Sequence, residues 1–224
     1  MGNSAGPKII TDSSLILNLD AANKKSYTGT GSTWTDLSKN KFNGTINRAT
    51  YSASRGGTFS FLPANTAYIN IPNFSVTCTS ATFSAWIYRD TSLAAYAGIM
   101  YSRAASAHGM DTHEISNNNL TYTWNNAANT YGWNSGITIP LQQWIHVSLV
   151  VSPTSAIYYV NSILRATNTV SHASATFSTM DIGLDNAAAR YFSGSIAICQ
   201  FYNRALTSTE VYNNFVANRG RFGV

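Results

Sequence analysis

The chain has 224 residues, a length that suits one all-β domain, and it carries a formal net charge of +5. Only 10% of the residues are charged, and the arginines are scattered singly from Arg48 to Arg221, which excludes a basic nucleic-acid surface. Serine, threonine and asparagine make up about a third of the chain. The surface is therefore expected to be neutral and polar, as suits contact with sugar hydroxyls or with like subunits.

The first residues, MGNSAGPKIITD, read as a polar arm that precedes the folded domain. They lack the charged and apolar regions of a secretory signal peptide. The sequence also contains no apolar run of the roughly eighteen residues that a membrane span needs. We predict an N-terminal arm at residues 1–12, a single domain at residues 13–224, synthesis in a cytoplasm and no membrane insertion.

Short runs rich in β-branched and aromatic residues, bounded by Gly, Asn, Ser or Pro, follow one another along most of the chain. Asn161 and Ser162 separate two such runs, which predicts a tight hairpin with a positive φ at Asn161. Each strand has one apolar face that only a second sheet can cover, so the pattern predicts an all-β, two-sheet antiparallel sandwich. Strands are expected at 14–19, 58–61, 67–71, 82–88, 97–102, 120–124, 144–151, 155–160, 176–183 and 191–202.

One segment near the end of the sequence has helical rather than strand spacing. Thr207 and Glu210 form a T-x-x-E capping box, and Val211 and Phe215 follow at helical intervals. Gly220 occupies a position typical of a helix C-cap. We expect one short C-terminal helix that begins after Thr207 and ends at Gly220.

Six motifs follow one another over nearly the whole chain: GPKIITDSSLILNLDAANKKSY, WTDLSKNKFNGTI, TFSAWIYRD, WIHVSLVV, IYYVNSIL and IGLDNAAARYFSGSIAICQFYNRALTSTEV. Together they resemble the laminin G-like branch of the concanavalin A-like lectin/glucanase superfamily. The resemblance implies a jelly-roll β-sandwich. It also raises glycoside hydrolysis, because the superfamily includes such enzymes.

The two ends of the chain carry a narrower resemblance. The opening GPKIITD…LNLDAANKKSY and the closing YNNFVANRGRFGV resemble versions of this domain in structural proteins of tailed bacteriophages. This implies a virion component, such as a capsid decoration, a head fibre or a tail-associated protein, assembled in the host cytoplasm. Its implied partners are other virion proteins, with homo-oligomeric or multivalent copies on the particle.

Glycosidic cleavage generally needs two carboxyl groups about 5 to 10 Å apart across a sugar. The chain has two glutamates, Glu114 and Glu210, and the capping box accounts for Glu210. In the cluster DTHE, a strand would place Asp111 and His113 on one face and Glu114 on the other. This arrangement is typical of an exposed strand edge with solvated charges. We therefore expect no enzyme activity, with a glycoside hydrolase as the weaker alternative.

Many members of the family bind a structural Ca²⁺ ion near an acidic turn. The matching turn here is FLPANTAYINI, in which residues 62–65 are not acidic. A hard cation needs several oxygen ligands, including carboxylates, so we expect no cofactor. Asp20, Asp36 and Asp185 remain as candidates for a calcium ligand. Asp36 is also expected, with Asn43, to bond the backbone of its own loop.

The stretch LTYTWNNAANTYGWNSG, at 120–136, is the best candidate for carbohydrate contact. A sugar site needs an aromatic face for the apolar side of the ring and amides or hydroxyls for its edge. Tyr131 and Trp133 flank a glycine in a turn-like context, which predicts an exposed aromatic pair. Trp124 alternates with Tyr122, a spacing that also favours core packing. The predicted glycan-binding residues are Tyr131, Trp133, Trp124, Asn125 and Asn134.

Other distinctive side chains are expected to be structural. Trp86, Trp144 and His146 lie inside apolar strand segments, which favours burial. Cys78 and Cys199 are too few for a disulfide framework and lack metal-ligand spacing. They are expected to be two buried free thiols, with a disulfide between them as the alternative.

Two functions of different classes fit the sequence. The first is a non-enzymatic virion protein that docks on other virion proteins. The second is a stand-alone carbohydrate-binding module for host or environmental glycans. The two functions are compatible, because a virion domain can also bind glycans.

Overall fold

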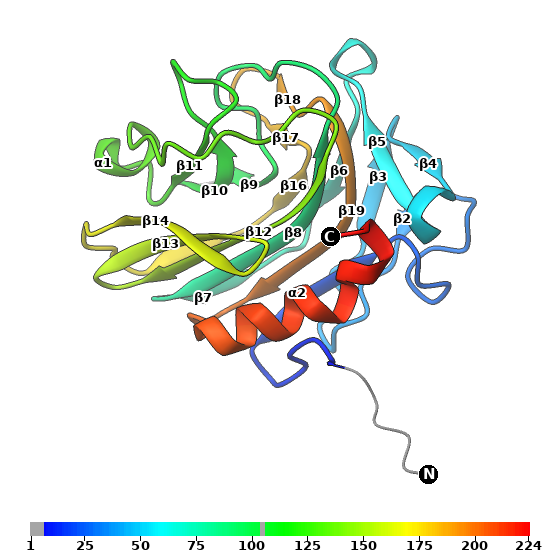
Figure 1. Cartoon of the computed structure of the whole chain (residues 1–224), viewed down its shortest axis with the longest axis horizontal. Coiled ribbons are helices and arrows are strands. Elements are labelled where there is room, and N and C mark those ends of the chain that lie inside the picture. The colour runs from blue at the N-terminus through cyan, green and yellow to red at the C-terminus, as the bar shows by residue number, and fades with distance from the viewer. Residues whose placement is uncertain (1–6, 104–105) are drawn as a thin grey trace.

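The computed structural model describes residues 7–103 and 106–224, whose strands form two large antiparallel sheets (Figure 1). The first sheet is ordered β14 (Ile163–Asn168), β13 (Ser155–Val160), β12 (Trp144–Ser152), β8 (Ala81–Arg89), β19 (Gly194–Tyr202), β5 (Thr58–Phe61) and β4 (Thr50–Ser52), with β1 (Leu15–Asp20) also paired to β19. The second is ordered β11 (Leu120–Thr123), β10 (Ala107–Thr112), β9 (Met100–Arg103), β16 (Met180–Ile182), β6 (Tyr68–Ile71), β3 (Gly44–Asn47) and β2 (Thr33–Trp34).

Smaller elements complete the described part of the chain. Two short ladders pair β7 (Val76–Cys78) with β15 (Ala175–Phe177) and β17 (Leu184–Asp185) with β18 (Arg190–Tyr191). Single 3₁₀ turns lie at Ser54–Gly56 and Pro63–Asn65, and the α-helices are α1 (Ala128–Tyr131) and α2 (Ser208–Phe222). Among the described residues, no helix has both the length and the hydropathy of a membrane span.

The main core lies between the two sheets and is supplied by alternate residues of each strand. In β8, Phe83, Ala85 and Ile87 face this core and are at most 1% exposed. Trp86, on the opposite face of β8, is also buried because α2 covers it. Since both faces of the central strands are covered, TFSAWIY and WIHVSLVV are nearly continuous apolar runs. The predicted antiparallel jelly-roll sandwich is confirmed.

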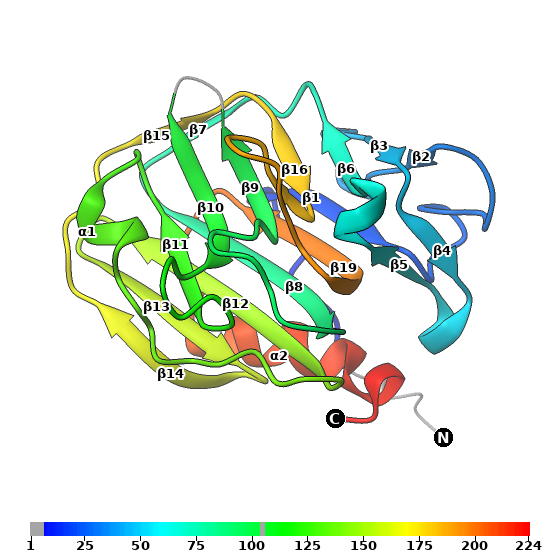
Figure 2. The same cartoon turned by 90° about the horizontal axis from the view of Figure 1, so that it is seen from above.

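Helix α2 lies on the outer face of the first sheet, on the side away from the second sheet (Figure 2). The capping box is confirmed, since the Thr207 side chain accepts a hydrogen bond from the Glu210 N–H and the Glu210 carboxylate accepts one from the Thr207 N–H. The predicted end at Gly220 is wrong. The Phe222 ring stacks on Trp86 at 4.1 Å, which holds the last turn in place, and Gly223 supplies the left-handed C-cap with φ 72°.

The layer between the first sheet and α2 contains the other structural side chains. His146 is 1% exposed, as predicted, and its Nε2 lies 2.8 Å from the Ser84 hydroxyl. Trp144 is only half-buried, because it begins β12 and only the end of α2 reaches it, through Phe222 at 4.8 Å.

The hairpin between β13 and β14 is confirmed, with φ 50° at Asn161 and 66° at Ser162. Both cysteines are buried and free, so the disulfide alternative is wrong. Burial raises the pKa of Cys78 to about 11 and that of Cys199 further. Both thiols are therefore kept protonated and unreactive.

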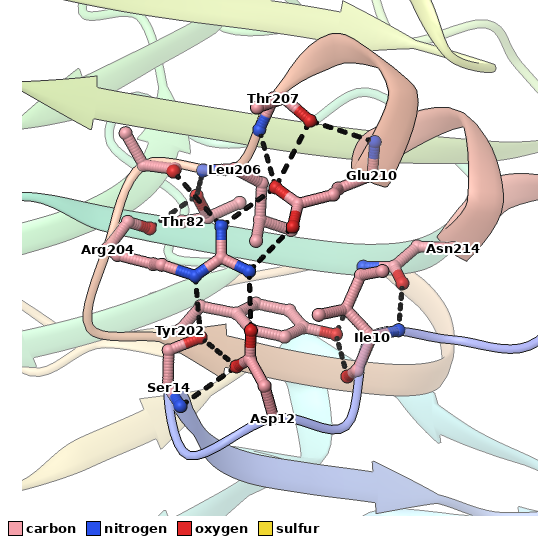
Figure 3. A network of polar contacts seen from close by, with 11 residues as sticks. Ile10, Asp12, Ser14, Thr82, Tyr202, Arg204, Leu206, Thr207, Glu210 and Asn214 are labelled. Atoms are coloured by element: carbon pink, nitrogen blue, oxygen red, sulfur yellow. Dashed lines mark hydrogen bonds and ion pairs between the residues drawn. The ribbon is translucent and has the colours of Figure 1, made fainter.

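A polar network around Arg204 joins the N-terminal segment to α2 (Figure 3). The Arg204 guanidinium donates to both Glu210 carboxylate oxygens and to Asp12 Oδ2, each at 2.7 Å. The Ile10 N–H donates to Asn214 Oδ1 at 2.8 Å. Within the predicted arm, residues 1–6 lie outside the described residues, whereas Ile10 and Asp12 contact the domain.

Candidate functional site

A hollow of about 200 Å³ lies on the outer face of the second sheet. Tyr101 on β9 and Thr123 on β11 form part of it, and they alternate with Met100 and Tyr122, which face the core. We call this hollow the arginine–tyrosine pocket. It is lined by Tyr96, Tyr101, Arg103, Thr123, Asn126, Tyr131, Ala187 and Arg190.

Two arginines of the pocket share one buried carboxylate. Arg103 donates to both oxygens of Asp185, at 2.6 and 3.1 Å, and Arg190 donates to Oδ2 at 2.9 Å. Asp185 is 0% exposed, whereas each arginine side chain is 28% exposed. Arg103 Nη1 and Arg190 Nε and Nη2 have no hydrogen-bond partner among residues 7–103 and 106–224. These guanidinium groups can therefore donate to acceptor oxygens of a ligand.

Aromatic rings form the rest of the pocket wall. The Arg190 guanidinium lies 4.4 Å from the centre of the Tyr96 ring, a cation–π contact. The Tyr96 and Tyr131 rings meet edge to face at 6.5 Å. Burial, with the nearby Glu114 carboxylate, raises the pKa of Tyr96 to about 12. Its hydroxyl is therefore neutral at physiological pH and can both donate and accept hydrogen bonds.

Unusual backbone conformations gather around the pocket. Tyr96, Asn125, Asn126 and Ala189 have φ values of 56°, 52°, 53° and 54°, all in the left-handed region. This region is unfavourable for a bulky side chain such as that of Tyr96. Residues held in such conformations concentrate at binding and active sites, which supports a binding role for this pocket.

Asp111 lies beneath the pocket floor and is 0% exposed, so the prediction of a solvated strand edge is wrong for this cluster. His113 is also buried, and only Glu114 is exposed. The physical reason is that β10 pairs on both sides, with β9 and β11, and is not an edge strand. Asp111 Oδ2 accepts from Thr123 at 3.3 Å. Burial, then the charge of Asp185, raises the pKa of Asp111 well above its usual value.

The structure separates the two rings that were expected to form an exposed pair. Tyr131 is half-buried and lines the pocket. Trp133 is also half-buried, but it stacks on Tyr158 at 6.4 Å and meets Tyr122 edge to face at 5.7 Å. Trp133 is not a lining residue of the pocket. Its packing against the other sheet depends on the tertiary fold, which the local sequence does not reveal.

The other predicted glycan-binding residues have internal partners. Trp124 is 1% exposed, and its Nε1 donates to the Ala173 carbonyl at 2.7 Å. Asn125 Nδ2 donates to the carbonyls of Ala173 and Ser174. Asn134 is exposed, and its side chain accepts from Asn119 at 3.1 Å. Glycan contact by these residues stays a prediction.

The candidate calcium ligands are each held by different partners. Asp20 pairs with Arg221 at 2.6 Å, and Asp185 pairs with the two pocket arginines. Asp36 accepts three backbone N–H groups, and its own N–H donates to Asn43 Oδ1, so both side chains bond loop backbone as predicted. Within the described ranges, no group of three or more His, Cys, Asp or Glu side chains could hold a metal ion.

Sequence reasoning missed every lining residue of the pocket except Tyr131, including Tyr96, Arg103 and Arg190. The available signal was weak, since Arg190 follows Asp185 in a short turn and arginine is scarce in this chain. Arg103 joins them only because β9 and the β17–β18 ladder lie side by side in the fold.

Comparison with known proteins agrees with this architecture. Residues 63–212 match the family described as concanavalin A-like lectin/glucanases superfamily, so the chain belongs to this superfamily. No curated protein matches the sequence.

Solved structures share the fold at low sequence identity. Domain 4 of AbnA, an extracellular arabinanase from Geobacillus stearothermophilus in complex with arabinotriose, is 17% identical with a TM-score of 0.70, over 89% of this chain and 97% of that one. Trypanosoma rangeli sialidase is 16% identical with a TM-score of 0.66, over 95% of this chain but 35% of the sialidase. The botulinum neurotoxin type G receptor binding domain is 14% identical with a TM-score of 0.63, over 91% of this chain and 51% of that domain.

Proposed function

We propose that the domain is a non-enzymatic carbohydrate-binding module whose ligand occupies the arginine–tyrosine pocket. The observation that carries this proposal is the convergence of tyrosine rings and unpaired guanidinium N–H groups on one outer face of the sandwich. Tyr96 and Tyr131 offer apolar surface to a sugar ring, and Arg103 and Arg190 offer donors to its oxygens. The relative with bound arabinotriose adds support at the level of the fold.

We propose no catalytic activity because of the way in which the carboxyl groups near the pocket are placed. Asp111 and Asp185 are both 0% exposed, so neither presents an oxygen to a ligand. Glu114, beside Tyr96, is exposed, but among the described residues it is a single carboxylate without a second one to complete a catalytic pair. Asp185 is also neutralised by two ion pairs. Glycosidic cleavage requires an acid and a base or nucleophile that reach the sugar.

A glycan array followed by calorimetry tests the proposal. We expect the wild-type domain to bind at least one glycan, and Tyr131→Ala and Arg190→Ala to weaken that binding at least tenfold. Tyr212→Ala is the matched control, because Tyr212 is 52% exposed on α2, away from the pocket. An array without hits, or binding that survives both pocket variants, would contradict the proposal.

We also propose that the domain serves as a virion component that docks on other virion proteins. The support is the resemblance of both ends to bacteriophage structural proteins, together with the hydrogen bond from the Ile10 N–H to Asn214 that joins the two ends. Copies repeated on a particle would convert weak sugar affinity into avidity. Cryo-electron microscopy of purified particles is the test, and a preparation with only free protein would contradict this role.

A further inference from the structure

A second hollow, of about 680 Å³, lies on the opposite side of the sandwich, on the outer face of the first sheet. The end of α2 at Phe222 and the segment 52–58 border it. We call it the back groove. Its volume falls in the range of about 300–1,000 Å³ that is typical of ligand clefts. Its floor contains Thr58, Ser60, Tyr88, Trp144 and Ser195.

The floor is a single cross-strand row set by strand register. Trp144 pairs with Tyr88, Tyr88 with Ser195, and Ser195 with Ser60, across β12, β8, β19 and β5. Paired residues on neighbouring strands point to the same face. With strands about 4.8 Å apart, the row extends over roughly 14 Å. The site therefore fits an extended ligand rather than a single ring.

One end of the row is aromatic and the other is hydroxylic. The Trp144 and Tyr88 rings lie 5.5 Å apart and both are half-buried, so they retain exposed surface. The hydroxyls of Ser60 and Ser195 have no hydrogen-bond partner among the described residues, and they are also half-buried. Each ring of a sugar chain has apolar C–H faces, which can pack on the aromatic rings, and an edge of hydroxyls, which can hydrogen-bond to the serines.

The electrostatics of the back groove specify the ligand further. Arg55 is the one charged side chain among its described lining residues, and amides of Gln142, Gln143 and Asn161 supply the remaining polar edge. The arginine–tyrosine pocket, by contrast, contains two guanidinium groups. Apart from the exposed Arg55, no described side chain of the groove offers a charge that would compensate for burying an ionised ligand group.

We propose that the back groove is a second binding site, for a neutral linear oligosaccharide that lies across the strands from Trp144 toward Ser60. The sugar ring at one end packs on Trp144 and Tyr88. Its neighbours hydrogen-bond to Ser195 and Ser60. This site does not depend on the arginine–tyrosine pocket, since no residue lines both.

Calorimetry with cellohexaose, xylohexaose and mannohexaose tests this site, with hexagalacturonic acid as the charged counterpart. We expect at least one neutral hexasaccharide to bind and to change tryptophan emission. Ser60→Tyr, which fills the groove without removing a packing contact, and Trp144→Ala should each weaken that binding at least tenfold. Tyr131→Ala should leave it unchanged, which separates this site from the pocket.

Thermal unfolding of each variant establishes that the loss of binding is not a loss of fold. If Trp144→Ala unfolds, Ser60→Tyr alone decides the question. The proposal is overturned if no neutral hexasaccharide binds at millimolar concentration, if only the charged hexasaccharide binds, or if a folded Ser60→Tyr variant binds like the wild type.

Discussion

The two outer faces of the sandwich differ in how they handle charge. The arginine–tyrosine pocket, on the second sheet, is built around a buried carboxylate and two arginines. The back groove, on the first sheet, is built from hydroxyls, amides and two aromatic rings. An anionic ligand of the pocket should therefore bind more weakly in high salt, whereas a neutral ligand of the groove should be nearly insensitive to salt.

The two sites also differ in how much each one destabilises the folded state. The pocket requires the buried carboxylate of Asp185, left-handed backbone at Tyr96 and a buried Asp111 whose pKa is raised well above its usual value, which are all unfavourable in isolation. The groove uses the regular register of a sheet and one wall from α2. The pocket is thus sensitive to changes in its own charges, and the groove to the attachment of the helix.

The largest expected effect comes from detaching α2. Trp86→Ala removes a ring that stacks on Phe222 at 4.1 Å and on Phe215 at 5.8 Å. We expect a loss of about 3 kcal/mol in the free energy of unfolding, at the lower end of the range because the indole N–H has no partner in the described structure. Urea unfolding measures it. Groove binding should fall while pocket binding persists, and equal loss at both sites would contradict the separation.

A change of pH should affect the stability of the protein with opposite signs through two buried groups, His146 beneath α2 and Asp181 in the second sheet. Burial lowers the pKa of His146 to about 3, so the unfolded chain binds a proton below about pH 6.5 that the folded chain does not. Stability should fall as pH drops from 6.5, by up to about 1.4 kcal/mol per pH unit. Urea unfolding at pH 7 and pH 5 measures this loss of stability for the wild type and for His146→Gln. The variant should lose less, and an equal loss in both proteins would contradict the assignment of the effect to His146.

Asp181 in the second sheet provides the opposite sign. Burial is the main cause that raises its pKa to about 6, so the folded chain keeps this proton up to about pH 6, whereas the unfolded chain releases it above about pH 3.8. Stability should therefore fall as pH rises from about 3.8 through 6. Asp181→Asn should remove this cost, and the variant should gain stability relative to the wild type above pH 6. The same urea titrations measure it.

A smaller effect is expected from the pocket charges. Arg103→Ala leaves the buried Asp185 with Arg190 and one backbone N–H, which should cost about 2 kcal/mol. Chemical unfolding and calorimetry together measure the variant, which should lose pocket binding and keep groove binding. Arg165→Ala is the control, because Arg165 is exposed and its side chain makes no hydrogen bond in the described structure. If Arg103→Ala weakened ligand binding in the groove and left binding in the pocket unchanged, the assignment of Arg103 to the pocket's ligand would be contradicted.

The smallest effect is expected from the network of Figure 3, which belongs to neither site. Arg204→Ala breaks ion pairs to Asp12 and Glu210, and partly exposed pairs of this kind contribute about 1 kcal/mol. Arg204 lowers the pKa of Glu210 to about 2. Its contribution is therefore present above about pH 4.5 and lost as pH falls toward 2. Thermal unfolding at pH 7 and pH 2 measures this loss, and both ligands should still bind at pH 7.

Local sequence patterns were sufficient for the fold. The runs TFSAWIY and WIHVSLVV, the Asn161–Ser162 turn and the capping box each combine a local propensity with a burial pattern, and all agree with the sandwich. The end of α2 was mispredicted at Gly220, because a tertiary contact between Phe222 and Trp86 overrides a weak local preference.

The candidate site could be predicted only in part. Tyr131 was identified, but its neighbours Tyr96, Arg103 and Arg190 come from other strands and loops. Asp111 was expected in water because a short acidic run looks like an exposed edge, whereas its strand is paired on both sides. Such juxtapositions depend on strand order, which periodicity does not encode.

The outward faces of the two sheets point in opposite directions, with about 10 Å between the sheet planes. A single domain with one sugar site on each face would be bivalent. It could cross-link two polysaccharide chains without self-association, and it would clump glycan-coated beads even when monomeric. Blocking either face should abolish clumping while the other site stays fully occupied.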